Sequence, residues 1–207
     1  MTVPLAGRCQ RVWKSALAAL LARQPQGRWL HTVPAPVSDL QSYVNANPRP
    51  LAQLAFYLAG ALHASDLARD GLRDGHVVAD RYVNSVIANH AAVHSLNHDT
   101  VTEAISPFTR YLAVPDITIY LHTSLAELAM RMRAKHDQTR SDRDLLDDRE
   151  LLHRLQDRYD QVAAGDPTAR HLQTTGRTPR QTRRTGSRNA PRSGRSPVEP
   201  QAQQSSR

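Results

Sequence analysis

The sequence predicts an α/β fold in three layers, in which helices flank a central parallel sheet. Short apolar runs that end abruptly in polar residues alternate with amphipathic helical stretches along the chain. Such runs are typical of strands buried on both faces, and the alternation is typical of parallel sheets. At 207 residues the chain is long enough for one sizeable domain with its own core.

The first half of the chain is predicted to hold two strands and three helical segments. The first helix is rich in Ala and Leu and is closed by the turn residues that follow it. Pro34 ends the second strand, and Pro50 stands near the start of the longest helix, whose Leu and Ala residues recur at helical spacing. Strands are predicted at 3–6 and 29–33, and helical segments at 14–23, 39–45 and 50–73.

The second half continues the same alternation. Gly75 separates the longest helix from the next strand, and Ser124 with Glu127 three residues later predicts a capping box at a helix start. The polar stretch 136–144 is predicted to be a loop. Strands are predicted at 76–79, 115–121 and 171–173, and helices at 85–94, 100–111, 125–135 and 147–164.

The net charge of +8 is concentrated at the C-terminal end. From Gly176 onward the chain holds eight Arg and one acid, so the rest is close to neutral. This end is rich in Arg, Ser, Thr, Pro and Gln and has almost no large apolar side chain, so it cannot bury enough surface to offset its ordering entropy. We expect a folded domain at 1–173 and a disordered tail at 174–207, which binds nucleic acid at most weakly and without specificity.

The single cysteine, Cys9, excludes an internal disulfide and favours a reducing, cytoplasmic location. No apolar run approaches the length of a membrane span. Residues 1–38 contain Arg but neither Asp nor Glu, as targeting segments do. We expect these residues to form the first part of the domain instead, because the segments that follow continue the same fold.

The most informative residues are Asp80 and Arg81, which follow the predicted strand at 76–79. The carboxyl ends of strands are where open α/β sheets build their sites. The planar guanidinium suits phosphate, and a carboxylate can hold a metal ion or its water shell. By themselves the two residues fit a salt-bridged strand end better than a functional site, because a lone motif of two residues is weak evidence.

Asp80 and Arg81 belong to a pattern that extends over three segments, at 56–66, 76–91 and 115–135. They hold the pattern DRY-x-x-S-x-x-A and, downstream, PD-x-TIYL. In this combination the chain resembles the thymidylate kinase family of P-loop nucleoside monophosphate kinases over about 50–164. The resemblance implies transfer of the γ-phosphoryl group of ATP to a (deoxy)nucleoside monophosphate, dTMP or a related acceptor, with Mg²⁺. A homodimer is also expected.

The resemblance also implies roles for single residues. Arg81 would contact the acceptor phosphate, and Asp80 would orient it or hold Mg²⁺ together with Ser15. Arg140 and Arg143 would lie in a mobile lid and neutralise the transferring phosphoryl group. The remaining acceptor residues are Phe56, Ser85, Asn89 and His90. From the residues alone, Phe56 fits a core position equally well, and the two Arg fit a surface salt-bridge network.

The segment that would bind ATP departs from the family pattern. Lys14 and Ser15 precede a suitable helix and are the candidate ATP-binding residues, but the two glycines of a P-loop fall on Arg8 and Trp13. The family's Arg-Glu-Pro stretch is replaced by Thr-Val-Pro at 32–34, and its base-contacting Arg by Gly60.

Three explanations remain open for these departures. The protein phosphorylates another acceptor, or it is a catalytically impaired nucleotide-binding homologue, or the first ten or so residues and the tail come from a shifted reading frame. A binding protein that acts through its basic tail is a further alternative.

Overall fold

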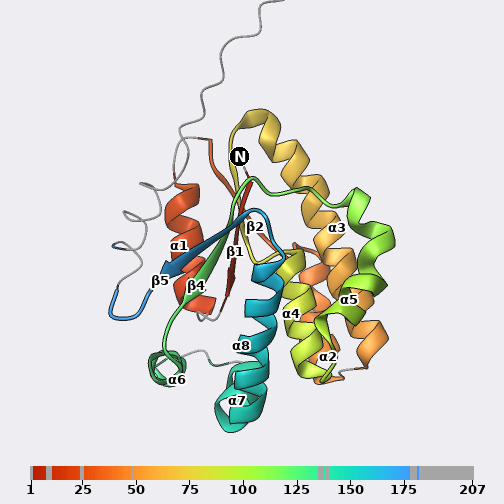
Figure 1. Ribbon diagram of the computed structural model, residues 1–207. Coiled ribbons are helices and arrows are strands. Elements are labelled where there is room, and N and C mark those ends of the chain that lie inside the picture. The colour runs from red at the N-terminus through yellow and green to blue at the C-terminus, as the bar shows by residue number, and fades with distance from the viewer. Residues whose placement is uncertain are drawn as a thin grey trace, which may run out of the picture.

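The structure is a computed structural model and describes residues 2–7, 11–23, 26–47, 49–134, 138, 140–177 and 181. Its centre is a parallel sheet with the strand order β2-β3-β1-β4-β5 (Figure 1). All four strand pairs are parallel, which confirms the predicted sheet. The strands are β1 (Thr2–Gly7), β2 (Arg28–His31), β3 (Val77–Asp80), β4 (Thr118–His122) and β5 (Ala169–Gln173).

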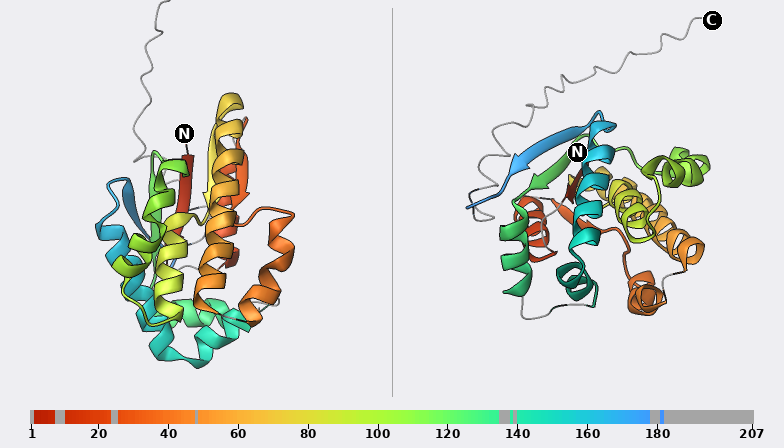
Figure 2. Two further views of the ribbon diagram at one scale, coloured as in Figure 1. Left: turned by 90° about the vertical axis from the view of Figure 1, so that its right-hand side faces the viewer. Right: turned by 60° about the horizontal axis from the view of Figure 1, so that its bottom comes forward.

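Helices cover both faces of the sheet, as the predicted three-layer fold requires (Figure 2). The α-helices are α1 (Arg11–Ala22), α2 (Gln41–Ala46), α3 (Pro50–Asp74), α4 (Val83–Val93), α5 (His98–Ile105), α6 (Leu125–Arg133), α7 (Arg140–Asp147) and α8 (Arg149–Ala164). Two 3₁₀ helices, η1 (Val37–Leu40) and η2 (Ser106–Tyr111), complete the described elements.

The sheet separates two hydrophobic clusters because successive strand side chains point to opposite faces. On one face Leu17 and Ala18 of α1 pack with Ile119 and Leu121 of β4. On the other face Tyr120, between those two residues of β4, joins a larger cluster from α3, α4, α5 and α8. Strand β3 is buried along its whole length, as its continuous apolar sequence predicts.

The structure differs from the prediction in two segments, one predicted as a helix and one as a loop. The helix predicted at 100–111 is the α-helix α5 followed by the 3₁₀ helix η2, because Pro107 has no N–H for an α-helical hydrogen bond. The stretch 136–144, predicted as a loop, includes the start of α7 at Arg140. Leu145 and Leu146 of α7 pack against a small cluster between α6 and α8, and this packing supports an otherwise polar helix.

The predicted cap of α6 is formed only in part. The backbone N–H of Glu127 donates to Oγ of Ser124 at 3.2 Å, as in a capping box. The carboxylate of Glu127 does not return to Ser124, however. It accepts the backbone N–H of Gly176 at 3.0 and 3.2 Å and pairs with Arg131, which also donates to the carbonyl of Thr174 at 2.8 Å. Helix α6 therefore holds the turn that follows β5.

Little of the predicted tail is described. Residues 174–177 and 181 are described, and the rest of 174–207 lies outside the described residues. Thr174 is fully buried, with its N–H and Oγ1 both donating to the carbonyl of His122. Among the described residues no helix has both the length and the apolar character needed to cross a membrane.

Candidate functional site

The candidate site starts at the carboxyl ends of β1 and β3. Asp80 is the last residue of β3, and Lys14 and Ser15 lie near the start of α1, which follows β1. The hydroxyl of Ser15 donates a hydrogen bond to Oδ2 of Asp80, and Lys14 is 1% exposed. The fold thus brings together residues that are far apart in the sequence and that were predicted to act on one phosphate and metal site.

Asp80 has the surroundings of a ligand-binding carboxylate. Its side chain is 3% exposed, and Oδ1 has no hydrogen-bond partner among the described residues. A buried carboxylate oxygen left in this state costs free energy, so it indicates a position for a ligand. Carboxylate and hydroxyl oxygens are the hard donors that Mg²⁺ takes, so Asp80 and Ser15 fit that ion.

His31 is a further titratable group near this carboxylate. It ends β2 in register with Asp80, and its Nδ1 lies 3.9 Å from Oδ2. The two residues at the glycine positions of the P-loop pattern belong to the same region of the chain. Arg8 lies outside the described residues, and the side chain of Trp13 is not described.

Arg81 leaves β3 with a left-handed backbone, at φ +70°. This conformation is uncommon for a residue with a side chain and often occurs at functional sites. The guanidinium donates to the hydroxyl of Tyr159 on α8 at 3.4 Å. Arg81 is therefore aimed across the carboxyl end of the sheet toward α8.

Tyr159 also connects to the acceptor residues on α4. The side-chain amide of Asn89 donates to the Tyr159 hydroxyl at 2.9 Å and to the carbonyl of Ser85 at 2.5 Å. Ser85 is 3% exposed, and its Oγ has no hydrogen-bond partner in the described part of the structure. Hydrogen bonds thus link four residues into one group: Arg81, Ser85, Asn89 and Tyr159. Tyr159 is the member that its sequence pattern does not single out, because an aromatic residue on an amphipathic helix also fits the core.

The ring of His90 contacts another histidine at the end of the same helix. Its ring lies 4.5 Å from the ring of His94, whose Nε2 is 2.7 Å from Oε1 of Gln53 on α3. Burial and the neighbouring His94 lower the pKa of His90 to about 4, so its imidazole is neutral near pH 7. Phe56, on the same helix as Gln53, is half-buried and packs edge-on against Tyr57.

Gly60 is a position of close packing between α3 and the segment after β2. A Cβ atom at this position would lie 2.8 Å from Cγ2 of Val33 and 2.9 Å from the carbonyl oxygen of Thr32. The segment after β2 therefore packs directly on the backbone of α3. No side chain can be placed at residue 60 without moving that segment.

The two predicted lid residues lie on α7. This helix lies at the end of the molecule toward which β1 runs (Figure 1). Arg143 is exposed, and the side chain of Arg140 is not described. The structure thus places both residues on the carboxyl side of the sheet, without a hydrogen bond from Arg143 to the groups around Asp80 in the described residues.

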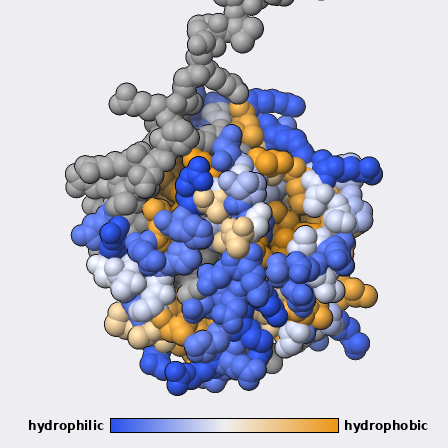
Figure 3. Space-filling model, viewed as in Figure 1, coloured by the Kyte–Doolittle hydropathy of each residue, from blue (hydrophilic) through white to orange (hydrophobic). Residues whose placement is uncertain are grey.

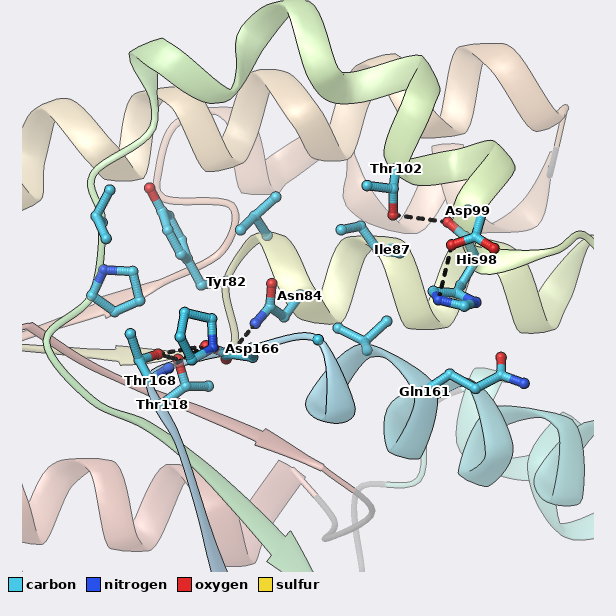
Figure 4. Close-up of a pocket in the computed structure, with 16 residues that line it drawn as sticks. Tyr82, Asn84, Ile87, His98, Asp99, Thr102, Thr118, Gln161, Asp166 and Thr168 are labelled. Carbon is cyan, nitrogen blue, oxygen red and sulfur yellow. Dashed lines mark hydrogen bonds and ion pairs between the residues drawn. The ribbon is translucent and has the colours of Figure 1, made fainter.

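A separate pocket of about 390 Å³ lies between α4, α5 and α8, near the amino ends of β4 and β5 (Figure 4). Asp166 accepts hydrogen bonds from Asn84 and the hydroxyl of Tyr120 at 2.8 and 3.0 Å, and from Thr168. Burial and Asp166 raise the pKa of Tyr120, so the phenol stays protonated. Asn84, Asp166, Thr168 and Thr118, drawn in the left part of Figure 4, are thus linked to one another by hydrogen bonds.

Solved structures with the same fold include two thymidylate kinases and a deoxyadenosine kinase. Thymidylate kinase from Candida albicans superimposes with a TM-score of 0.72 at 19% identity, over 90% of this chain and 89% of that one. Thymidylate kinase from Ehrlichia chaffeensis gives 0.62 at 15% identity, over 91% and 97%. Deoxyadenosine kinase from M. mycoides, solved with dCMP and dCDP, gives 0.64 at 15% identity, over 91% and 97%.

The sequence itself identifies the family. No curated protein matches the chain. The family model of thymidylate kinase, however, matches residues 39–183, which is more than half of the chain. The matched part includes Asp80, Arg81 and Tyr159, which the fold groups at the carboxyl side of the sheet. The chain belongs to the thymidylate kinase family.

Proposed function

We propose that the protein transfers the γ-phosphoryl group of ATP to a (deoxy)nucleoside monophosphate, with dTMP or a related nucleotide as the acceptor. The observation that carries this proposal is the hydrogen bond from Ser15 to the buried carboxylate of Asp80. It joins the start of α1, where donor phosphates would bind, to the end of β3, where the acceptor residues begin.

Each residue of this edge has a role in the proposal. Lys14 binds phosphate oxygens, and Ser15 with Asp80 holds Mg²⁺, which supplies charge neutralisation during the transfer. Arg81 binds the acceptor phosphate, and Tyr159 keeps its guanidinium in place through the contact of 3.4 Å. Positioning and neutralisation of charge are what phosphoryl transfer mostly requires from a protein.

The remaining predicted residues complete the acceptor side and the lid. Ser85 and Asn89 contact the acceptor next to Arg81, while Phe56 and His90 border it from the α3 side. Arg140 and Arg143 act from α7, which would have to approach the edge of the sheet on nucleotide binding. A homodimer, a cytoplasmic location and weak binding of nucleic acid by the basic tail also belong to this proposal.

A catalytically impaired nucleotide-binding homologue is the second candidate. The observation that favours it is the occupation of two glycine positions of the P-loop pattern by Arg8 and Trp13. A side chain at these positions hinders the close approach of backbone N–H groups to phosphate.

Ligand-induced stabilisation separates the two candidates. The thermal midpoint would be measured with ATP and Mg²⁺, and separately with each common nucleoside monophosphate. A kinase predicts that both kinds of nucleotide raise the midpoint. A response to a monophosphate without any response to ATP and Mg²⁺ would support the impaired homologue and contradict the proposed activity.

A further inference from the structure

A pair of histidines lies on the two outermost strands at the β5 edge of the sheet, outside the proposed kinase site. Nε2 of His122 on β4 lies 2.7 Å from Nδ1 of His171 on β5, and the ring centroids are 4.9 Å apart. His171 is exposed and His122 is half-buried, so an ion can reach the two nitrogens from solvent.

The strand pairing explains why the two rings meet. Tyr120 and His122 are two residues apart and therefore lie on the same face of β4. The parallel register places Tyr120 opposite His171. The ring of His171 stacks on that of Tyr120 at 5.7 Å with an interplanar angle of 23°. The hydroxyl of Tyr120 donates to Asp166 at 3.0 Å, which fixes the tyrosine that supports His171.

The backbone of His122 is held in place by Thr174. Its carbonyl accepts hydrogen bonds from the N–H and Oγ1 of Thr174 at 2.8 and 2.9 Å. The backbone of His122 and the ring of His171 are thus held before any ligand binds, and ligands held in this way lose less entropy on coordination.

We propose that His122 and His171 form a binding site for a divalent transition-metal ion with tetragonal geometry, Ni²⁺ or Cu²⁺. Imidazole nitrogen is a preferred ligand of both ions, and both favour square-planar or tetragonal coordination. Ligands at a typical metal–nitrogen distance of about 2.0–2.1 Å lie about 2.9 Å apart when they are adjacent in a square plane, and about 3.3 Å apart in a tetrahedron. The observed 2.7 Å is closer to the square-planar value.

Coordination requires a change of tautomer but no change of charge. In the metal-free pair one nitrogen donates its hydrogen to the other. To bind an ion, both Nε2 of His122 and Nδ1 of His171 must offer a lone pair, so each neutral ring carries its proton on its other nitrogen. Among the described residues no group of three or more His, Cys, Asp or Glu could hold an ion, so the proposed site takes two ligands from this part of the chain.

The site is separate from the proposed Mg²⁺ position at Ser15 and Asp80. Mg²⁺ prefers oxygen ligands, whereas this pair offers only imidazole nitrogen. An ion here would join β4 to β5, directly before the turn at Thr174 that α6 holds. It would therefore stabilise the folded chain against unfolding, and the stabilisation would grow with the logarithm of the ion concentration above Kd.

The test is a calorimetric titration of the full chain, without an affinity tag and without nucleotide, with Ni²⁺ and with Mg²⁺. We expect one Ni²⁺ per chain and no binding of Mg²⁺. His122→Asn and His171→Asn should each weaken Ni²⁺ binding about tenfold or more, whereas the control His63→Asn on α3 should leave it unchanged. A chain that binds no Ni²⁺ at millimolar concentration, or variants with unchanged affinity, would overturn the proposal.

A spectroscopic readout makes the result independent of the stability of the variants. The electron paramagnetic resonance spectrum of the parent chain with one equivalent of Cu²⁺ should show coupling to two imidazole nitrogens. His171→Gln, at the more exposed position, should remove one of them. A spectrum without imidazole coupling in the parent chain would contradict the site whatever the variants do.

Discussion

The hydroxyl of Ser15 on α1 donates a hydrogen bond to the carboxylate of Asp80 at the end of β3. We predict that Ser15→Ala lowers kcat by about 10²-fold or more, because the variant loses one oxygen ligand of the proposed Mg²⁺ position. A shift of the Mg²⁺ dependence to higher concentration should accompany the loss of rate. A steady-state assay at varied Mg²⁺ would measure both effects, with the exposed Ser106→Ala as the control.

Tyr159 accepts hydrogen bonds from both Arg81 and Asn89. In Tyr159→Phe these two groups lose their common acceptor, so we expect KM for the nucleoside monophosphate to rise about tenfold, with a smaller change in KM for ATP. The free energy of unfolding should fall by about 1–2 kcal/mol. Tyr43→Phe, at a residue that is 71% exposed, is the control. Equal increases in both KM values would show that Tyr159 has only a structural role.

Burial of His90 makes the stability of the protein depend on pH. Its pKa is lowered to about 4 in the folded chain from 6.5 in the unfolded chain. Between these values the unfolded chain binds more protons, so the free energy of unfolding rises with pH. This contribution is complete above about pH 6.5 and is lost as the pH falls toward 4.

Replacement of His90 tests this dependence directly. His90→Gln should flatten the change in unfolding free energy between about pH 6.5 and 4.5 by on the order of 2 kcal/mol, as measured by urea denaturation. The exposed His153→Gln should keep the slope of the parent chain. An unchanged slope in His90→Gln would mean that another group causes the acid sensitivity.

Gly60 packs against the segment after β2, so we expect an alanine at this position to lower the stability of the protein. Gly60→Ala should destabilise the protein by about 1–3 kcal/mol, although alanine normally stabilises a helix, because its Cβ would overlap Val33 and the carbonyl of Thr32. Gly165→Ala is the matched control, since its Cβ meets only an oxygen at 3.8 Å. Thermal unfolding of both variants measures the difference. Equal stability of the two variants would show that the segment moves aside freely.

The sequence predicts the layers of the fold well, because the signals that specify them are local. The apolar run before Asp80 is a fully buried strand, and Pro50 and Gly75 border the longest helix as predicted. Helix α7 escapes prediction because its stretch is polar and its support comes from only Leu145 and Leu146 packing on neighbouring helices.

The site was predicted less completely, because side-chain partners depend on distant elements. The pattern of α8 is amphipathic, and an aromatic residue on its apolar face cannot be told from a core residue by spacing. The role of Tyr159 becomes visible only when Arg81 and Asn89 lie against its hydroxyl. Likewise, no local signal shows that Glu127 accepts the backbone N–H of Gly176, which lies 49 residues further along the chain.

The central claim, that the protein is a nucleoside monophosphate kinase, is tested most directly by a phosphoryl-transfer assay. The parent chain would be incubated with ATP, Mg²⁺ and each common nucleoside monophosphate in turn, and diphosphate formation would be followed. We predict transfer to at least one acceptor, with dTMP as the first candidate, and a loss of about 10²-fold or more in Arg81→Gln. Absence of diphosphate with every acceptor, or full activity in Arg81→Gln, would contradict the proposed function or its proposed site.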